Sequence, residues 1–286
     1  MNESPSTAQE TIIERAHSFH LFSWRELVAY RDLLWMLIWR DFASRYKQTI
    51  LGPLWFIIQP LLMTAVFTIV FGKFARLSPG DTPPGLFYLC GLLAWNYFAQ
   101  TFQSTSSTLV NNVGIFSKVY FPRLIVPLSS VVSNLGTLVI QIVTFAAVYI
   151  AYKTIGTPGD TYVRWETIFL PLVVLQVAAL SLGVGLWLAA LTTRYRDFTV
   201  LAVFLLQLWL YATPVIYPLE RVPLAWKFAV ELNPMTMPVE CFRYMLLNTG
   251  QPELRLIVLS ASITVACLVT GLYAFKRVER NFVDVV

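Results

Sequence analysis

Side chains that could perform chemistry are few in this sequence and widely separated along it. The two histidines, His17 and His20, lie three residues apart near the N-terminus, and such a pair is usually solvated surface. The three cysteines are Cys90, Cys241 and Cys267, and their lack of CxxC spacing argues against both a metal site and a disulfide framework. No GxxxxGK(S/T) motif occurs, so this chain does not hydrolyse ATP through a P-loop.

The composition indicates which elements must carry the remaining polar groups. Of the 286 residues, 57% are AVILMFWYC and only 13% are DEKR, whereas soluble domains carry about 25% charged residues. The apolar residues form blocks that reach or exceed the roughly 18 to 20 residues needed to cross a bilayer. The sequence therefore predicts an all-α, polytopic membrane protein and excludes a soluble enzyme. The net charge of +5 does not indicate nucleic-acid binding, because Lys and Arg lie at the ends of the apolar blocks.

Six membrane spans are predicted within a transmembrane domain of residues 51–286. An even number of spans returns both termini to one side, and the segments on that side hold more of the Lys and Arg, so both termini are expected in the cytoplasm. Residues 1–20 are expected to be a cytoplasmic tail without a cleavable signal peptide, since they contain no apolar core. The spans cover about residues 53 to 72, 86 to 104, 124 to 152, 167 to 191, 198 to 217 and 255 to 275.

Residues 21–50 are predicted to form an amphipathic interfacial region before the first span. Arg25, Asp32 and Arg40 share one helical face, opposite an apolar face rich in tryptophan. Arg31 and Asp41 break this pattern, so two short helices are an alternative. The apolar run is too short to span a bilayer, and tryptophan beside arginine suits a helix in the membrane interface. A helix packed on the cytoplasmic side of the protein itself is equally compatible.

The segment between the fifth and sixth spans, residues 218 to 254, does not resemble an ordinary loop. Its apolar stretches are broken by Asn233 and Pro234, and Glu240 and Arg243 lie three residues apart. Two short re-entrant or interfacial helices joined at Asn233 fit best, and they would cap a cavity from the outer side. A plain amphipathic loop on the outer leaflet is the alternative.

The predicted span interiors contain no Asp, Glu, His or Arg, the residues that usually carry charge in proton- or sodium-coupled transport. An energy source for active transport would therefore have to be a partner protein. The spans do contain amides and hydroxyls, most of which are expected to hydrogen-bond between helices. A cavity with such groups and aromatic rings would nevertheless suit a sugar chain. The candidate aromatic residues for this pathway are Trp55, Trp95, Tyr97 and Phe98.

Several local patterns, each weak alone, occur in one order along the chain. In combination they resemble the permease subunits of ABC-2 type exporters, specifically those of O-antigen, capsular or teichoic-acid polysaccharide, over about residues 25 to 280. The patterns are Arg45-Tyr46-Lys47; Leu51-Gly52-Pro53-Leu54-Trp55; Val119-Tyr120-Phe121-Pro122-Arg123 with Pro127 following; Arg194-Tyr195-Arg196-Asp197; Thr213-Pro214-Val215-Ile216-Tyr217-Pro218; and Asn233-Pro234-Met235 leading to Arg243.

The resemblance implies a half-transporter in the inner membrane of a bacterium that forms a homodimer and pairs with two copies of a separate ATPase. ATP and Mg would be used by that ATPase, and this chain would bind no cofactor or metal. Closure of the ATPase subunits would push on a coupling helix, shift the spans and open a central pathway. A lipid-linked polysaccharide would then advance outward from the cytoplasm.

The resemblance also implies roles for individual residues. A pyrophosphate on the glycan lipid would meet cations at the inner mouth, although lipid headgroups are an equal alternative for these cations. The inner-mouth cations are Arg45, Lys47 and Arg123; the expected coupling residues are Asn112, Ile115, Phe116, Lys118 and Tyr120; and the expected outer gate residues are Asn233, Pro234, Glu240 and Arg243.

Two other functions remain open. An ABC-2 exporter of a drug or lipid would share the same architecture, and the aromatic content and paired outer helices favour sugar. A membrane-embedded transferase would need Asp, Glu or His near the membrane surface. Its only candidates, Asp197 and Glu240, fall on opposite sides in the predicted topology, which makes this alternative the weakest.

Overall fold

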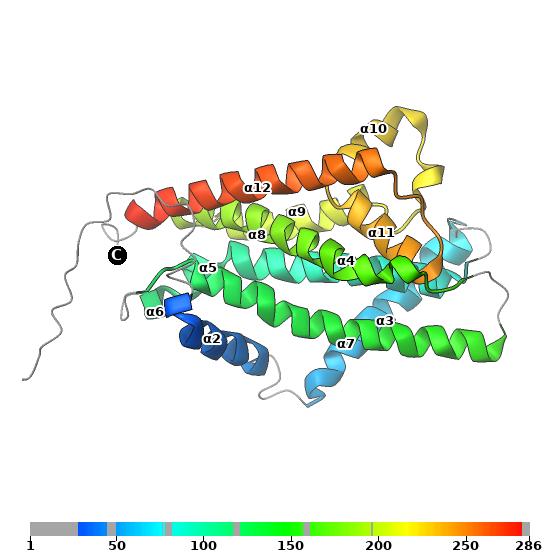
Figure 1. The fold of residues 1–286 in the computed structure, drawn as a ribbon, viewed down its shortest axis with the longest axis horizontal. Coiled ribbons are helices and arrows are strands. Elements are labelled where there is room, and N and C mark those ends of the chain that lie inside the picture. The colour runs from blue at the N-terminus through cyan, green and yellow to red at the C-terminus, as the bar shows by residue number, and fades with distance from the viewer. Residues whose placement is uncertain are drawn as a thin grey trace, which may run out of the picture.

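The computed structural model describes residues 28–44, 50–75, 77, 82–116, 121–156, 161–195 and 197–281, and every regular element within them is helical. The long helices run side by side along the molecule, with α5 and α6 near one end, the α6 end, and α10 near the other, the α10 end (Figure 1). The elements are α2 (Arg31–Ser44), η1 (Gly52–Leu54), α3 (Trp55–Phe67), the π-helical η2 (Thr68–Phe74), α4 (Pro84–Ser106), α5 (Thr108–Asn111), α6 (Val113–Phe116), α7 (Ile125–Ile155), η3 (Trp165–Phe169), α8 (Leu170–Arg194), α9 (Asp197–Ala212), η4 (Leu219–Arg221), α10 (Leu224–Leu232), α11 (Thr236–Leu247) and α12 (Leu254–Asn281).

Each of the six predicted spans overlaps a helix, the first both α3 and η2, but these helices are not equally suited to cross a membrane. In the described part of the chain, four segments are long and apolar enough to span: Gly52–Phe74, Ile125–Ile155, Trp165–Arg194 and Leu254–Glu279. Helix α9 has 16 residues, about 24 Å at 1.5 Å per residue. Helix α4 has 23 residues but carries several amides and hydroxyls in the half that begins at Asn96. The count of six spans therefore stays a prediction.

Proline and glycine set several of the helix boundaries. Pro84 occupies the first turn of α4, where a missing N–H costs nothing. Gly156 ends α7 with a φ of 73°, in the left-handed region that favours glycine. Helix α9 stops at Ala212, five residues before the predicted end of its span, because Pro214 disfavours helical backbone at Thr213. The backbone from Thr213 to Pro218 is consequently not helical and needs other hydrogen-bond partners.

Helix α4 forms the centre of the bundle, in contact with α3, α7, α8, α9 and α11. Helices α8 and α12 approach most closely at Gly183, where an added Cβ would lie 2.7 Å from the Cα of Leu268. Small residues recur at four-residue intervals in α8 and form a packing face. Ser181 and Ala189 are fully buried, and a Cβ on Gly185 would lie 2.7 Å from the Cβ of Thr105 on α4.

Helix α2 is the described part of the predicted amphipathic region, and one side of it packs on α7. Leu37 belongs to an apolar cluster with Phe121, Ile125 and Val126. A Cβ on Gly136 of α7 would lie 2.8 Å from the ring of Phe42. These contacts support a helix packed on the protein itself. An interfacial position for its other face stays a prediction.

Candidate functional site

The two short helices expected around Asn233 are present as α10 and α11, and the side chain of Asn233 fastens their junction to the end of α9. Its Oδ1 accepts hydrogen bonds from the Trp209 indole N–H at 2.9 Å and from the Met235 backbone N–H at 3.0 Å. Its Nδ2 donates to the Ala212 carbonyl at 3.1 Å and to the Thr213 hydroxyl at 2.9 Å. All the polar atoms of this side chain are therefore engaged, and α11 begins in a fixed position relative to α9.

Arg243 on α11 is buried and holds the non-helical backbone that follows α9. Its Nη1 donates to the Pro214 carbonyl at 2.6 Å and to Glu240 Oε1 at 3.0 Å, and its Nη2 donates to the Val215 carbonyl at 2.8 Å. The guanidinium lies 3.6 Å from the centroid of the Phe87 ring on α4. Arg243 is 1% exposed and Glu240 is 3% exposed. The predicted neighbours Glu240 and Arg243 thus form a buried ion pair that joins α11 to α9 and α4.

Two glycines, which have no side chain, make room for this ion pair. A Cβ on Gly91 of α4 would lie 3.0 Å from Arg243 Nη2, so any larger residue there would displace the guanidinium. Gly250 has a φ of 108°, and a Cβ on it would lie 2.9 Å from the backbone oxygen of Glu240. This tight turn brings the Gln251 backbone N–H to Glu240 Oε2 at 3.3 Å. The carboxylate is therefore bonded from both sides.

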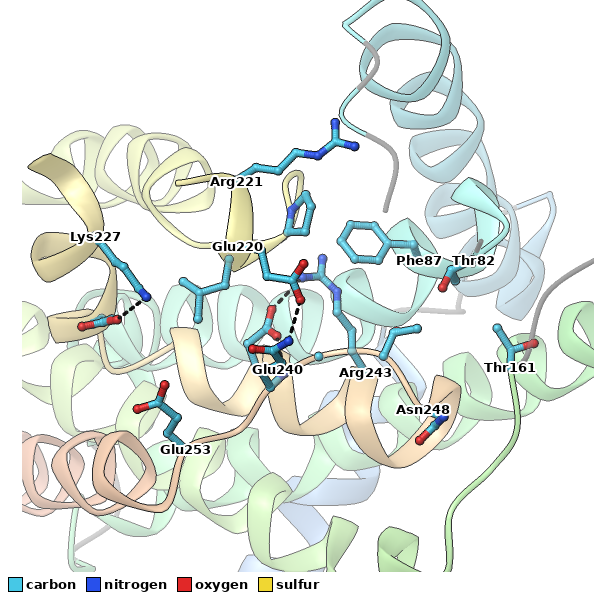
Figure 2. A pocket seen from close by; sticks show the side chains of 16 residues that line it. Thr82, Phe87, Thr161, Glu220, Arg221, Lys227, Glu240, Arg243, Asn248 and Glu253 are labelled. Atoms are coloured by element: carbon cyan, nitrogen blue, oxygen red, sulfur yellow. Dashed lines mark hydrogen bonds and ion pairs between the residues drawn. The ribbon is translucent and has the colours of Figure 1, made fainter. Parts of the chain in front are cut away.

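A cavity of about 460 Å³ opens above this ion pair at the α10 end. Figure 2 shows Glu240 and Arg243 at its base, with Phe87 and Thr82 on one side and Lys227 and Glu253 on the other. Two further polar pairs lie on its wall, Lys227 with Glu231 at 3.7 Å and Gln251 with Glu220 at 2.9 Å. The other lining residues are Thr161, Pro218, Leu219, Arg221, Asn248, Thr249 and Gly250.

Arg164, which precedes η3, binds the far end of α11. Its backbone N–H donates to the Met245 carbonyl at 2.9 Å, and its Nη1 donates to Asn248 Oδ1 at 2.8 Å. The guanidinium lies 4.3 Å from the centroid of the Tyr244 ring and forms two hydrogen bonds with Glu166, at 3.0 and 2.8 Å. The hydrogen bond with Glu166 raises the pKa of the Arg164 guanidinium above its ordinary value.

At the α6 end, the expected coupling segment packs against Phe121 and the first turn of α7. The rings of Phe116 and Phe121 have centroids 5.7 Å apart. The Arg123 guanidinium lies 5.7 Å from the centroid of the Phe116 ring. The Arg123 backbone N–H donates to Glu279 Oε1, and its Nη1 donates to the Glu279 carbonyl, both at 3.2 Å. Arg123, expected at the inner mouth, is therefore engaged with the C-terminal part of α12.

The remaining residues of that end are only partly described. Asn112 is half-buried and donates to the Thr108 carbonyl at 3.0 Å, and Ile115 packs on the cluster that contains Leu37 of α2. Helices α2 and α6 thus contribute to one apolar cluster. Four expected residues lie outside the described part of the chain: Arg45, Lys47, Lys118 and Tyr120.

The aromatic residues expected to line a substrate pathway divide into two groups. Trp55 at the start of α3 is 48% exposed. Trp95 is 5% exposed, Tyr97 is 2% and Phe98 is 0%, so these three lie inside the bundle. The Phe98 ring contacts the Trp209 indole of α9, with centroids 4.9 Å apart. The pathway role of all four stays a prediction, and for the buried three it requires movement of neighbouring helices.

Two of the membrane amides join helices, as expected from the sequence. Asn134 of α7 donates to the Thr101 hydroxyl of α4 at 3.2 Å. Gln176 of α8 donates to the Ser260 hydroxyl of α12 at 2.7 Å, and Ser260 donates to the Pro234 carbonyl at 2.7 Å. These bonds link Pro234 to two long helices. Among the described residues, no cluster of three or more His, Cys, Asp or Glu side chains could hold a metal ion.

The residue that the sequence did not reveal is Arg164. An Arg-x-Glu pair between two spans is a detectable signal for a local ion pair, but its partner Asn248 lies 84 residues further along the chain. Asn248 ends α11 with a φ of 54°, a conformation that Asn tolerates better than most residues. Contacts of such separation are fixed by the packing of α8 against α11, which a single sequence does not show.

Residues 32–247 match the model of a family described as ABC-2 type transporter. The chain is 29% identical to the O-antigen export system permease protein RfbA of Myxococcus xanthus, over 91% of this chain and 97% of that protein. It is 27% identical to the RfbA protein of Klebsiella pneumoniae, over 89% of this chain and 95% of that protein. The polysialic acid transport protein KpsM of Escherichia coli is 23% identical, over 72% of this chain and 78% of that protein.

Proposed function

Because this chain belongs to the ABC-2 type transporter family, we propose that it is the membrane subunit of an ATP-driven exporter. Its proposed substrate is a lipid-linked polysaccharide, such as O-antigen or capsule. The observation that carries this proposal is the likeness to permeases named for O-antigen export, which extends over nearly the whole length of both chains. A relative named for polysialic acid transport supports a polysaccharide rather than a drug as the substrate.

In this proposal the chain is a half-transporter of six spans, including α4 and α9. It works as a homodimer with two copies of a separate ATPase. In this proposal, helix α4 is stabilised within the membrane by the five helices that surround it. The α6 end lies in the cytoplasm with both termini, and the α10 end faces outward, so that the bacterial inner membrane is crossed with α10 and α11 as re-entrant helices.

The α6 end is proposed to bind the ATPase and to transmit its conformational change to the membrane helices. Phe116 packs on Phe121, which lies four residues before α7, and Arg123 joins the same region to α12 through Glu279. A push on α6 would therefore reach α7 through their shared apolar cluster and α12 through Arg123. The shared apolar cluster would carry α2 with it, because Leu37 of α2 packs with Phe121.

The α10 end is proposed to be the outer gate. Asn233 and Arg243 both bind the segment from Trp209 to Val215, so α9 and α11 are fastened together by hydrogen bonds. Displacement of α9 would thus move α11. It would also uncover Phe98, because the Trp209 indole now covers that ring. Trp55, Trp95, Tyr97 and Phe98 remain the proposed aromatic contacts of the glycan.

Co-purification tests the proposal most directly. The tagged protein would be extracted from its native membrane in mild detergent, and the proteins that accompany it would be identified by mass spectrometry. We expect a P-loop ATPase in stoichiometric amount, and loss of the gene for this chain should leave glycan inside the cell. Reproducible absence of an ATPase from intact protein would contradict the transporter class. Normal surface glycan in the deletion strain would contradict the substrate.

A further inference from the structure

The cavity at the α10 end, here called the outer cavity, is lined by segments that are far apart in the sequence. Thr82 precedes α4, Thr161 precedes η3, Glu220 belongs to η4, Lys227 belongs to α10, and Glu253 precedes α12. Figure 2 shows these side chains around one space, whose volume is about 460 Å³. Sites for small molecules have volumes of roughly 300 to 1,000 Å³. The outer cavity is therefore large enough for a small ligand or for a short segment of a longer one.

The lining of the outer cavity divides into a buried part and an exposed rim. Thr82 and Thr161 are only 6% and 5% exposed, and Glu240 and Arg243 are 3% and 1% exposed. Glu253 at the rim is exposed. A ligand that reaches the buried part loses its contacts with water, so its polar groups must find hydrogen-bond partners in the protein.

Three of the four carboxylates that line the outer cavity already have partners within the protein. These contacts join Arg243 to Glu240 at 3.0 Å, Lys227 to Glu231 at 3.7 Å, and the Gln251 side chain to Glu220 at 2.9 Å. A charged ligand would have to compete with these contacts, and separating a buried ion pair is costly. The charge distribution of the outer cavity therefore favours an uncharged ligand.

Three threonine hydroxyls in the lining are not used by the protein itself. Within the described part of the chain, the Thr249 hydroxyl is buried without a hydrogen-bond partner. The side chains of Thr82 and Thr161, although buried, form no hydrogen bond with another described residue. Buried polar groups are nearly always hydrogen-bonded, and a hydroxyl can both donate and accept. These threonines therefore offer hydrogen bonds that match the hydroxyl groups of a sugar.

Helix α10 directs its charged side chains toward the outer cavity and its large apolar side chains away from it. Lys227 and Glu231 line the cavity. Leu224, Trp226 and Phe228 are not part of the lining, and they are 88%, 68% and 74% exposed. A helix on the surface of a soluble protein normally has the opposite orientation, with its apolar face toward the protein. The space behind α10 is therefore a polar compartment of the protein, separated by this helix from apolar surroundings.

We propose that the outer cavity binds a short, uncharged saccharide segment of the exported chain through hydrogen bonds to Thr82, Thr161 and Thr249. The inference rests on the proposed function, because it takes the cargo to be a polysaccharide and the α10 end to face outward. A segment bound there lies on the outer side of the ion pair between Glu240 and Arg243. The outer cavity is thus a subsite for the part of the chain that has already passed the gate.

Replacing threonine by valine removes the hydroxyl while nearly keeping the shape of the side chain. Thr82→Val and Thr161→Val should each weaken saccharide binding about fivefold, the effect of losing one hydrogen bond. The double variant should weaken it roughly 25-fold, because the two hydroxyls act independently. Neither hydroxyl has a described partner in the protein, so the double variant should not have a lower Tm than the wild type. A purely structural role for these threonines predicts the reverse pattern.

Thr105→Val is the matched control. The Thr105 hydroxyl is also buried without a described partner, but it follows Phe87 of the cavity lining by 18 residues along α4. At 1.5 Å per residue this places it about 27 Å away. Saccharide binding by Thr105→Val should therefore equal that of the wild type.

Binding is measured on the full chain in complex with its ATPase, in detergent, by saturation-transfer NMR titration. The probe is the set of disaccharides released by partial acid hydrolysis from the surface glycan of the same cells. Their affinity should change less than about twofold between low and high salt, because an uncharged ligand is not subject to ionic screening. Glycerophosphoethanolamine, the charged headgroup of a membrane lipid, is titrated for comparison and should bind more weakly. Glycan export by the double variant should fall at least about twofold.

Weaker binding in the two threonine variants and not in Thr105→Val, together with reduced export, supports the subsite. It is overturned if the wild type binds no disaccharide, if the double variant binds as tightly as the wild type, or if glycerophosphoethanolamine binds more tightly. Normal export by a double variant that has lost binding would show that the ligand is not the exported chain. Normal surface glycan in the deletion strain contradicts the proposed function instead, and the titration still decides whether the outer cavity binds a saccharide.

Discussion

Removal of the buried charge at Arg243 offers a strict test of how α11 is held. Arg243→Met keeps much of the side-chain volume but removes every hydrogen bond of the guanidinium. The Glu240 carboxylate would lose its ionic partner, and the carbonyls of Pro214 and Val215 would lose their donors. Breaking a buried ion pair by removing one partner costs about 3 to 5 kcal/mol, because the other charge is left without compensation.

Glu240→Leu breaks the same pair from the other side and completes a double-mutant cycle. It leaves Arg243 with two carbonyls and the Phe87 ring, at 2.6, 2.8 and 3.6 Å. In the double variant neither charge is buried, and only the two carbonyls and the Gln251 backbone N–H lack partners. The double variant should therefore lose less stability than the sum of the single variants, by roughly 2 kcal/mol, because each single loss includes the penalty of an isolated charge.

Thermal unfolding in mild detergent at a fixed scan rate measures this effect. At roughly 2 °C per kcal/mol for a protein of this size, Arg243→Met should lower the apparent Tm on the order of 10 °C. Lys227→Ala should change it by less than about 1 °C, since its ion pair with Glu231 is partly exposed. A cycle that is additive within about 0.5 kcal/mol would refute the ion pair as a coupled unit.

Three further changes test other parts of the structure. Gly183→Ala should lower the Tm by several degrees, because its Cβ would press on the backbone of α12, whereas Gly114→Ala has open space and should have little effect. Asn233→Ala should reduce glycan export more than Asn233→Asp, which keeps the acceptor for the Trp209 indole; equal effects would refute that role. Phe116→Ala should uncouple ATP hydrolysis from export with normal membrane levels, and unchanged export would exclude Phe116 from coupling.

The helices could be predicted from the sequence because each apolar block is long and ends at proline, glycine or charge. The α9 boundary was predicted too late, at residue 217, because an apolar run continues past Ala212 although Pro214 interrupts the helix. The ion pair of Glu240 and Arg243 was visible in their spacing, since residues three apart lie on one helical face. Its burial was not visible, because it depends on carbonyls from another element.

The aromatic residues show why the rest of the site was harder to predict. Trp95, Tyr97 and Phe98 occur within four positions of α4, and a helical period alone does not distinguish a lumen from a packed core. Their burial follows from contacts with other helices, for example Phe98 with Trp209, 111 residues away. Arg164 was missed for the same reason, because its partners Met245 and Asn248 are on a helix formed much later in the chain.

The central position of α4 bears on the order in which the chain enters the membrane during synthesis. This helix follows α3 in the sequence but is less apolar than the four strongest spans, and its main neighbours α7 and α8 are made after it. Thr101 of α4 has Asn134 of α7 as a partner only once the later helix has arrived. In a lipid environment such groups favour association with other helices. Helix α4 is thus expected to reach its final position in the membrane only after α7 and α8 have been made, together with them and not as a span inserted alone.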